Sequence, residues 1–377
     1  MGAAARRAAL SCFRTVATLA PSPCMILRDL LRVLGSADRR DGRNLTHEEA
    51  YRAFLTILDG EESEIRIGAF LIALRWKGVT VDEVTGFARA ARERATIPCQ
   101  GQAGLVCLCP PHDGYDLTPP LEVVAGLVAA GAGTRVLLVA DRGVPPRRGL
   151  TGAHVLEELG APMSWDPAEA ERNVARAGFG AIAAPGMLPA LLGLRRVRGD
   201  VGVRTPLSTV EKLIVPDSAA LLLGSNPGPV LGLAAGTMAG LGHSSGIAIQ
   251  GVGGGIIPSL TRRTRGVEIT GAHQVPLSVE PSDFGLACKE NPELPMYGPP
   301  EEGQGPGDNP ALVRAAGEMA ASVLKGEPSA ARNATLLGAA VILKVARRAL
   351  TLAEGVDAAI KSLESGAARA ALAKLKT

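Results

Sequence analysis

Apolar residues recur at helical spacing through the first hundred positions of the chain. A first set has the spacing i, i+3, i+4, i+7 and consists of Tyr51, Phe54, Leu55 and Leu58. A second stripe consists of Ile65, Ala69, Ile72 and Ala73. Thr46 and Thr80 each precede a Glu by three residues, which is the signature of a capping box at a helix N-terminus. Residues 26–97 are therefore expected to form short helices joined by short loops, a small helical bundle.

After Pro98 the pattern changes to short apolar runs that alternate with helical segments. Such runs are typical of buried strands, and we expect strands at 105–109, 135–140, 181–184, 219–223 and 246–250. Helices are expected at 121–132 and 151–159 and over most of 311–376, with an irregular, flexible segment at 290–310.

Strands and helices that alternate at this pace indicate parallel βαβ units. The predicted fold class is α/β: a small N-terminal helical domain, residues 25–98, precedes a larger α/β domain, residues 99–377. In the larger domain, helices flank a mainly parallel sheet.

Composition excludes some classes of function. Aromatic residues make up 3% of the chain, too few for a base-stacking platform. The net charge is +3, from 40 basic and 37 acidic residues, which taken over the whole chain implies no polyanionic partner. Residues 1–24 hold three arginines and no acid, so the excess lies there. This segment is either an overextended start before Met25 or an organellar transit sequence.

The six cysteines lack the paired CxxC spacing of a zinc site, and Cys107 and Cys109 are expected to be small buried residues of a strand. No apolar run is long enough to cross a membrane, so we expect no membrane partner. A reducing cytoplasm fits this cysteine usage, with organellar import as the alternative if residues 1–24 are a transit sequence.

Ligands of open α/β sheets bind beyond the carboxyl ends of the strands, so four segments are candidates: 110–120, 141–151, 185–206 and 251–266. In the first, Pro110 and Pro111 lack the N–H groups that a pyrophosphate cradle needs. His112 and Asp113 are either an acid/base pair or magnesium contact, or simply turn residues. The glycine cluster 251–258 lacks the lysine of a P-loop and allows close approach by a ligand or by a neighbouring segment.

Ten arginines fall in these segments. They are Arg142, Arg147, Arg148, Arg195, Arg196, Arg198, Arg204, Arg262, Arg263 and Arg265. Arginine binds phosphate through a planar fork, so these residues predict an anion-binding rim on a neutral core. The alternative is ordinary solvated arginine.

Five segments, in order along the chain, resemble glycosyltransferase family 3, the anthranilate phosphoribosyltransferases and their relatives. They are residues 45–93, which begin LTHEEAYRAF, GAHVLEELG (152–160), GVRTPLSTVEKLIVP (202–216), SDFGL (282–286) and RNATLLGAAVILKV with its continuation to residue 368. The resemblance implies a pentosyltransferase fold with the active site between the two domains. It also implies a homodimer formed through the helical domain.

The motifs that carry the family's chemistry are altered. Active members have a GTGGD loop, a KHGNR stretch and an Asp-Glu magnesium pair; the corresponding segments here read CPPHDGYD, VADRG and GVGGGIIPSLTRRTRG. Only Asp113 stands where the GTGGD acid could be, and no acid precedes Glu268 in the third segment. Arg204 matches the arginine that contacts the aromatic acid. The loss of the cradle, the lysine and the metal ligands is expected to cost many kcal/mol of transition-state stabilisation.

One branch of the family keeps the fold, loses these motifs and resembles nucleic-acid-binding proteins. PPRRGLTG (145–152), STVEKL (208–213) and QGVGGGIIPS (250–259) are closer to that branch. The leading hypothesis is therefore a homologue whose cleft binds phosphate-rich ligands such as single-stranded nucleic acid. Its predicted phosphate contacts are Arg142, Arg147, Arg148, Lys212, Arg262 and Arg263.

The second hypothesis is an active phosphoribosyl or glycosyl transferase, of the anthranilate type of tryptophan biosynthesis, that binds a phosphorylated small molecule. Arg204 would then contact the acceptor, Asp113 a magnesium ion, and Arg147 with Arg148 the phosphate. Magnesium is implied on this hypothesis alone, and no metal ligand set or catalytic residue is predicted from the residues themselves. A structural protein that acts through its dimer is the third alternative.

Overall fold

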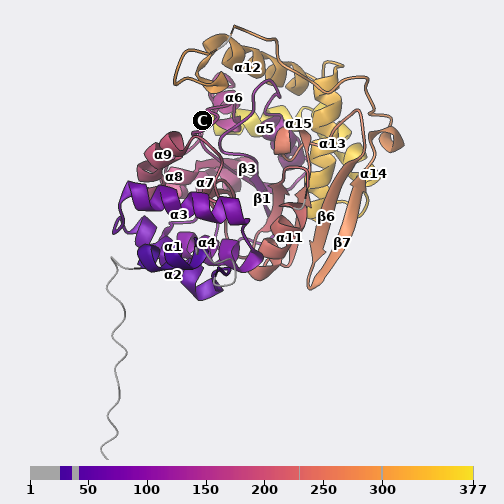
Figure 1. The fold of residues 1–377 in the computed structure, drawn as a ribbon. Helices are drawn as coiled ribbons and strands as arrows, with labels where there is room; N and C mark the ends of the chain where they lie inside the picture. The colour runs from indigo at the N-terminus through magenta and orange to yellow at the C-terminus, as the bar shows by residue number, and fades with distance from the viewer. Residues whose placement is uncertain (1–25, 36–41, 229, 299, 377) are drawn as a thin grey trace, which may run out of the picture.

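The computed structural model describes residues 26–35, 42–228, 230–298 and 300–376, so the predicted leader 1–24 lies outside the described residues. The first four helices are α1 (Ile26–Leu34), α2 (His47–Leu58), α3 (Glu64–Lys77) and α4 (Val81–Arg94). They lie together at one side of the molecule (Figure 1). Both predicted capping boxes are present, at Thr46 with Glu49 and at Thr80 with Glu83. The predicted N-terminal helical bundle is confirmed.

Helix α3 is apolar on two faces, and the predicted stripe lies on the outer one. Ile65 is 86% exposed, Ala69 and Ile72 are also exposed, and Trp76 is 93% exposed. The core contacts come from the opposite face, through Ile67, Phe70, Leu71 and Leu74. Helical spacing identifies an apolar face but does not say which of two faces meets the core.

A seven-stranded sheet forms the centre of the larger domain, in the order β3-β2-β1-β4-β5-β6-β7. Its strands are β1 (Leu105–Cys109), β2 (Arg135–Ala140), β3 (Phe179–Ala183), β4 (Ala220–Gly224), β5 (Ser245–Ile249), β6 (Thr264–Thr270) and β7 (His273–Val279). The first five are parallel and lie within two residues of the predicted strands. The predicted mainly parallel α/β sheet is confirmed.

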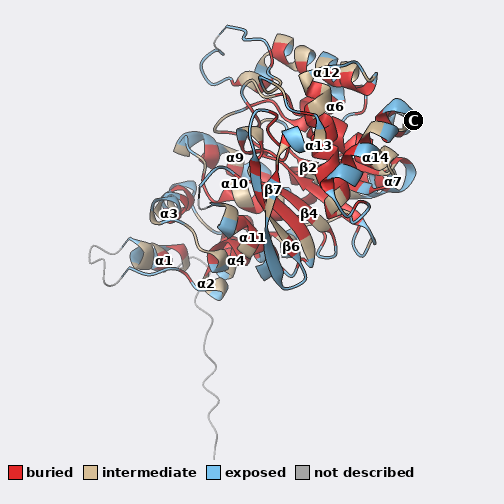
Figure 2. Cartoon of the chain, turned by 90° about the vertical axis from the view of Figure 1, so that its right-hand side faces the viewer, coloured by how far each residue is buried: buried red, intermediate tan, exposed pale blue. Residues whose placement is uncertain are grey.

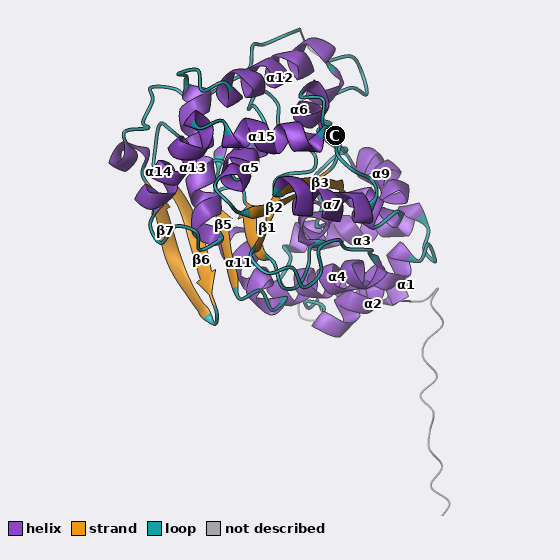
Figure 3. Cartoon of the chain, turned by 180° about the vertical axis from the view of Figure 1, so that it is seen from behind, coloured by secondary structure: helices purple, strands orange, loops and turns teal. Residues whose placement is uncertain are grey.

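The antiparallel hairpin β6–β7 was not predicted, and it projects from one edge of the sheet (Figure 3). Strand β7 is mostly exposed, so it lacks the apolar run by which the buried strands were found. Arg265 accordingly lies in a strand, although the sequence assigned it to a loop. The segment 185–206, also expected to be a loop, is mostly helical, because the chain forms α8 (Ala184–Met187) and α9 (Ala190–Val201).

The remaining helices flank the sheet. They are α5 (Glu122–Gly131), α6 (Gly152–Glu158), α7 (Pro167–Ala177), α10 (Leu207–Val210), α11 (Val230–Gly240), α12 (Pro310–Leu324), α13 (Ala330–Val345), α14 (Leu352–Glu364) and α15 (Ala367–Leu375). Helices α5 and α6 and the helical C-terminal stretch occur where predicted. Among the described residues no helix is long and apolar enough to cross a lipid bilayer.

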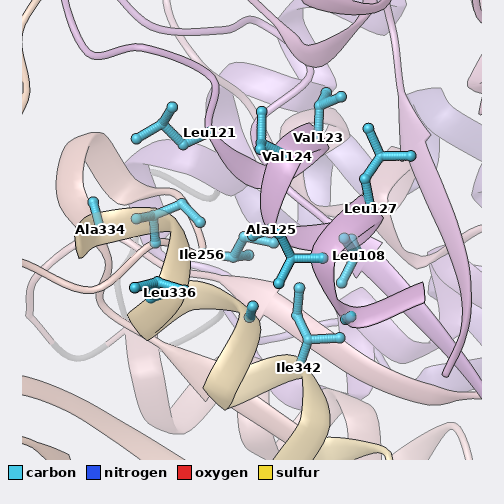
Figure 4. Close-up of a cluster of buried hydrophobic side chains, with 14 of the residues drawn as sticks. Leu108, Leu121, Val123, Val124, Ala125, Leu127, Ile256, Ala334, Leu336 and Ile342 are labelled. Atoms are coloured by element: carbon cyan, nitrogen blue, oxygen red, sulfur yellow. The ribbon is translucent and has the colours of Figure 1, made fainter. Parts of the chain in front are cut away.

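The core has two parts, one on each face of the sheet, and the alternation of side chains along the strands assigns residues to them. Val106 and Leu108 of β1 point to the face covered by α5 and α13, where Figure 4 shows Leu108 beside Leu127 and Ile342. Leu105, Cys107 and Cys109 point to the face that α4 covers. Both cysteines are fully buried, as predicted. Figure 2 shows that most of the central strands are buried.

Candidate functional site

A cavity of about 410 Å³ lies at the carboxyl ends of β1 and β4, between α3 of the helical domain and the α/β domain. We call it the interdomain cavity. Its polar lining comes from Arg75, Asp113, Arg204, Thr205, Ser208, Thr209, Lys212, Ser225 and Asn226. Its apolar lining includes Val79, Leu223, Val230, Leu233 and Ala234. Three predicted site residues, Asp113, Arg204 and Lys212, therefore share one cavity.

Asp113 and Arg204 form a two-pronged ion pair on the cavity wall. The guanidinium donates from Nε to Oδ2 of Asp113 at 2.5 Å and from Nη2 to Oδ1 at 2.8 Å. Asp113 is 2% exposed. Burial lowers the pKa of Arg204, but the hydrogen bonds and charge of Asp113 outweigh burial and leave it raised. Arg75 of α3 donates to the carbonyl oxygen of Arg204 and so joins the helical domain to the pair.

Lys212 presents a further cation to the cavity. Its ammonium group donates to the carbonyl oxygen of Gly224, at the carboxyl end of β4, over 2.8 Å. Burial lowers the pKa of Lys212 below its ordinary value. A half-buried ammonium group with one carbonyl partner keeps two further N–H bonds for an anionic ligand.

Behind the cavity, His112 and Glu211 belong to a buried polar cluster. The His112 ring donates from Nε2 to the carbonyl of Val139 over 3.2 Å, which leaves Nδ1 unprotonated in the neutral ring. Nδ1 lies 3.9 Å from Oε1 of Glu211, and Arg198 donates to the other oxygen of Glu211. Burial lowers the pKa of His112 to about 4 and raises that of Glu211. His112 is thus a neutral buried ring rather than a ligand contact.

The glycine cluster lies against a neighbouring segment and also borders the interdomain cavity through Gly254, so both alternatives that the sequence left open stand. A Cβ on Gly255 would lie 2.2 Å from the hydroxyl oxygen of Tyr115, and one on Gly254 would lie 2.3 Å from Oδ1 of Asn226. Tyr115 is 2% exposed, so its ring fills the space beside this loop. With Pro110 and Pro111 in the facing loop, few backbone N–H groups are left to cradle a pyrophosphate.

The segment that would carry magnesium ligands contributes to the hydrophobic core instead. Ile256 is fully buried and Ile257 nearly so, both on the α5 and α13 face (Figure 4 labels Ile256). Glu268 lies in β6 and pairs with Lys344 at 3.2 Å. In the part of the chain that the structure describes, no three His, Cys, Asp or Glu side chains are grouped to hold a metal ion. The residues of this segment do not fit magnesium, which prefers oxygen ligands.

Most of the ten arginines are paired with carboxylates. The pairs are Arg142–Glu157, Arg147–Asp116, Arg195–Asp141, Arg196–Glu64, Arg198–Glu211, Arg204–Asp113 and Arg263–Glu280. Within the described residues, Arg148, Arg262 and Arg265 are exposed and have no such partner. The sequence located the cations but could not show how many of them the chain itself neutralises.

The predicted phosphate contacts fall at different places. Arg142 and Arg148 line a second hollow of about 460 Å³, together with Arg195 and Arg196 of α9. Arg147 donates to the carbonyl of Gly114, next to Asp113 of the interdomain cavity. Arg262 and Arg263 lie before β6 and line neither space.

Several residues of the interdomain cavity were missed from the sequence. Arg75 comes from a helix of the other domain, and no local pattern marks it. Ser225 and Asn226 directly follow β4. Ligands bind beyond the carboxyl ends of strands, and this rule also applies to the predicted strand 219–223. Its application there would have identified Ser225 and Asn226 as candidates.

The chain matches two family models. Residues 37–95 match the helical bundle domain of a glycosyl transferase family, and residues 118–369 match the a/b domain of a glycosyl transferase family. The anthranilate phosphoribosyltransferase of Symbiobacterium thermophilum is 32% identical over 338 residues, which covers 89% of this chain and 94% of that protein. The enzyme of the same name from Anaeromyxobacter sp. (strain K) is 33% identical and covers 89% and 95%.

Solved structures agree with these matches. Anthranilate phosphoribosyltransferase from Thermus thermophilus superposes with a TM-score of 0.75 at 26% identity, covering 93% of this chain and 99% of the other. The Saccharomyces cerevisiae enzyme in complex with PRPP and Mg has a TM-score of 0.73 at 18% identity and covers 94% and 97%, a similarity of fold alone.

Proposed function

This chain belongs to glycosyl transferase family 3, and from that membership we propose that it binds phosphate-rich ligands, such as single-stranded nucleic acid, at the interdomain cavity. We further propose that it does not carry out ordinary phosphoribosyl transfer. The observation that carries the proposal is the cavity's charge: Arg75, Arg204 and Lys212 face it, against one carboxylate, Asp113. An excess of cations at the carboxyl ends of parallel strands favours an anionic ligand.

The loss of ordinary transfer is argued from the residues that replace the family's motifs. A leaving pyrophosphate must be stabilised by a metal and by backbone N–H donors. Here prolines occupy the first loop, Tyr115 packs on the glycine cluster, and Ile256 and Ile257 are in the core. Each replacement removes donors or ligands that the transition state requires.

A cavity of about 410 Å³ is of the size that holds one small ligand, so a strand has to continue over its rim. Arg147 contacts the loop that carries Asp113, and Arg148 has an exposed guanidinium. We assign these two residues, with Arg142, to the phosphates outside the cavity. Arg262 and Arg263 stay proposed contacts of a longer strand.

Titration of a fluorescent single strand at increasing salt tests this assignment. Each neutralised phosphate should lower log K by about 0.7 per log unit of salt. The double variant Arg147→Ala/Arg148→Ala should therefore flatten the slope by about 1.4, whereas Arg94→Ala, which removes an arginine paired with Asp59 on the helical domain, should not change it. Absence of binding at low salt, or a slope unaffected by salt, would contradict the proposal.

An active phosphoribosyltransferase is the second candidate, favoured by Arg204 in the cavity and by the relatives' identity over most of both chains. In this candidate Arg204 contacts the acceptor, Asp113 a magnesium ion, and Arg147 with Arg148 the phosphate. Asp113 would first have to leave Arg204, which occupies both of its oxygens. Calorimetry with phosphoribosyl pyrophosphate and magnesium decides: heat at millimolar ligand with product from anthranilate supports this candidate, and absence of both supports the first.

We also propose a homodimer formed through the helical domain. The supporting observation is the outer stripe of α3, where Ile65, Ile72 and Trp76 are exposed. Apolar residues contiguous on one helix face are typical of an interface. In sedimentation experiments Trp76→Asp should raise the dimer dissociation constant at least tenfold, whereas Trp165→Asp should not. An unchanged constant for Trp76→Asp would contradict this interface.

A reducing, cytoplasmic location is proposed from the thiols. Cys99, Cys107, Cys109 and Cys288 are free, and burial raises the pKa of Cys99 to about 11. Thiols of this kind persist where disulfides do not form. Imaging of the full chain with and without residues 1–24 tests the location and the alternative of organellar import.

A further inference from the structure

The carboxylate of Asp113 already occupies the guanidinium that the interdomain cavity offers through Arg204. Both of its oxygens are bound, at 2.5 and 2.8 Å, to the edge formed by Nε and Nη2. A guanidinium edge of this kind binds one carboxylate in the same two-pronged geometry. A carboxylic acid that enters the cavity therefore finds the Nε and Nη2 edge of Arg204 already occupied by a carboxylate.

The pair is held from both sides. Asp113 is 2% exposed, and the backbone that aims it is fixed by Gly114, whose φ is +74° and whose hypothetical Cβ would lie 2.4 Å from the carbonyl oxygen of Leu150. The next residue, Tyr115, exchanges two backbone hydrogen bonds of 2.8 Å with Leu150. Arg204 is held from the helical domain through Arg75. These contacts hold the backbone on both sides of the ion pair.

We propose that Asp113 is a specificity-determining residue: an internal carboxylate that keeps carboxylic acids off Arg204 and leaves the cavity to ligands whose phosphate is bound by Lys212. An external acid can bind the Nε and Nη2 edge of Arg204 only by displacing Asp113, which then remains buried without a partner, and that is costly. At the remaining N–H groups of the guanidinium, an external acid would lie beside the negative charge of Asp113, which disfavours it. Lys212 has no carboxylate hydrogen bond among the described residues, and the hydroxyls of Ser208 and Ser225 line the same cavity. The phosphate preference rests on the proposed function; the exclusion of acids does not.

Calorimetric titration with benzoate, with neutral benzamide as the comparison, tests the exclusion. Asp113→Asn should raise benzoate affinity at least tenfold over the unaltered chain and leave benzamide affinity within twofold. The double variant Asp113→Asn/Arg204→Gln should return benzoate affinity to the level of the unaltered chain. Asp59→Asn is the matched control, because Asp59 forms the same two-pronged pair with Arg94 on the helical domain, at 2.9 and 3.0 Å.

Two results would overturn the exclusion. One is a folded Asp113→Asn variant that gains no benzoate affinity. The other result does not depend on the folding of Asp113→Asn. It is that the unaltered chain binds benzoate at least tenfold more tightly than the double variant, which would mean that Arg204 already binds external acids. Equal, weak binding by those two proteins supports the proposal.

Inorganic pyrophosphate separates this inference from the proposed function. Binding of pyrophosphate by the unaltered chain, weakened at least tenfold by Lys212→Gln, supports the phosphate preference. If pyrophosphate does not bind but Asp113→Asn gains benzoate, the exclusion stands and the proposed function fails. If pyrophosphate binds and benzoate affinity is unchanged by Asp113→Asn, the proposed function stands and the exclusion fails.

Discussion

Replacing Glu122 by glutamine should change the way in which the stability of the fold depends on pH. Glu122 is the first residue of α5 and is 1% exposed. Neither of its carboxyl oxygens has a hydrogen-bond partner among the described residues. Burial raises its pKa from 4.5 to about 8. The folded chain therefore holds a proton on Glu122 that the unfolded chain has already released at neutral pH.

The sign and size of the effect follow from this difference in pKa. A carboxyl whose pKa is higher in the folded chain contributes stability that is fully present below the unfolded value, near pH 4.5, and is lost as the pH rises through about 8. Each pKa unit corresponds to about 1.4 kcal/mol, so the full loss is about 5 kcal/mol and the loss at pH 7 is about 3 kcal/mol. Glu122→Gln carries no titrating proton, and any cost of its unpaired amide is the same at every pH.

Urea unfolding followed by circular dichroism at pH 5, 7 and 8.5 measures the effect as the difference between the two proteins. The variant should gain on the unaltered chain by about 4 kcal/mol between pH 5 and pH 8.5. Glu48→Gln, which alters an exposed carboxyl paired with Arg52, is the control and should show no such trend. A difference that stays constant within about 0.5 kcal/mol across this range would refute the reasoning, because it would mean that Glu122 titrates alike in both states.

Three further predictions concern stability, measured by urea unfolding at pH 7. Arg198→Met leaves Glu211 buried without its partner and should lower the free energy of unfolding by about 3–5 kcal/mol. The double variant Arg198→Met/Glu211→Met should restore most of this loss. If it restores none, the loss comes from packing rather than from the unpaired charge. Gly86→Ala should destabilise by about 2 kcal/mol although alanine favours helices, because its Cβ would lie 2.5 Å from the carbonyl oxygen of His47; a stabilised variant would contradict this close crossing of α2 and α4. Glu83→Ala should cost about 3 kcal/mol, since that fully buried carboxylate accepts from two backbone amides and a lysine, and a loss below about 1 kcal/mol would contradict its role.

The elements that the sequence located are those whose signal is local. Strands β1 and β2 begin and end at the predicted residues, because a run buried on both faces is apolar along nearly its whole length, with only Arg135 at the start of β2 exposed. Strand β7 has no such run, since it lies at the sheet edge and is mostly exposed. The segment that forms α9 was expected to be a loop because it follows the predicted strand 181–184, and its arginines were therefore assigned to the rim, although Arg198 is buried.

The candidate site was predicted only in part, because only some of its residues have a local signal in the sequence. Asp113 and Arg204 were both named from the sequence, each in a loop beyond a strand, but their pairing joins residues 91 positions apart. Arg75 was not named, because it reaches the cavity from a helix of the other domain. The second hollow, with Arg142 and Arg148, likewise needs α9 to complete its wall.

By itself the sequence determined the two-domain organisation, the parallel strands, the capping boxes and the absence of acids from residues 251–266. These features depend on residue identity and on spacing within a few turns or one strand. Only the tertiary structure decided that seven of the ten rim arginines pair with carboxylates, that the ring of Tyr115 packs on the glycine cluster, and that the stripe of α3 faces outward. Each of these depends on which distant side chains the fold brings within a few ångströms of one another, and charge pairing and close packing act only over such distances.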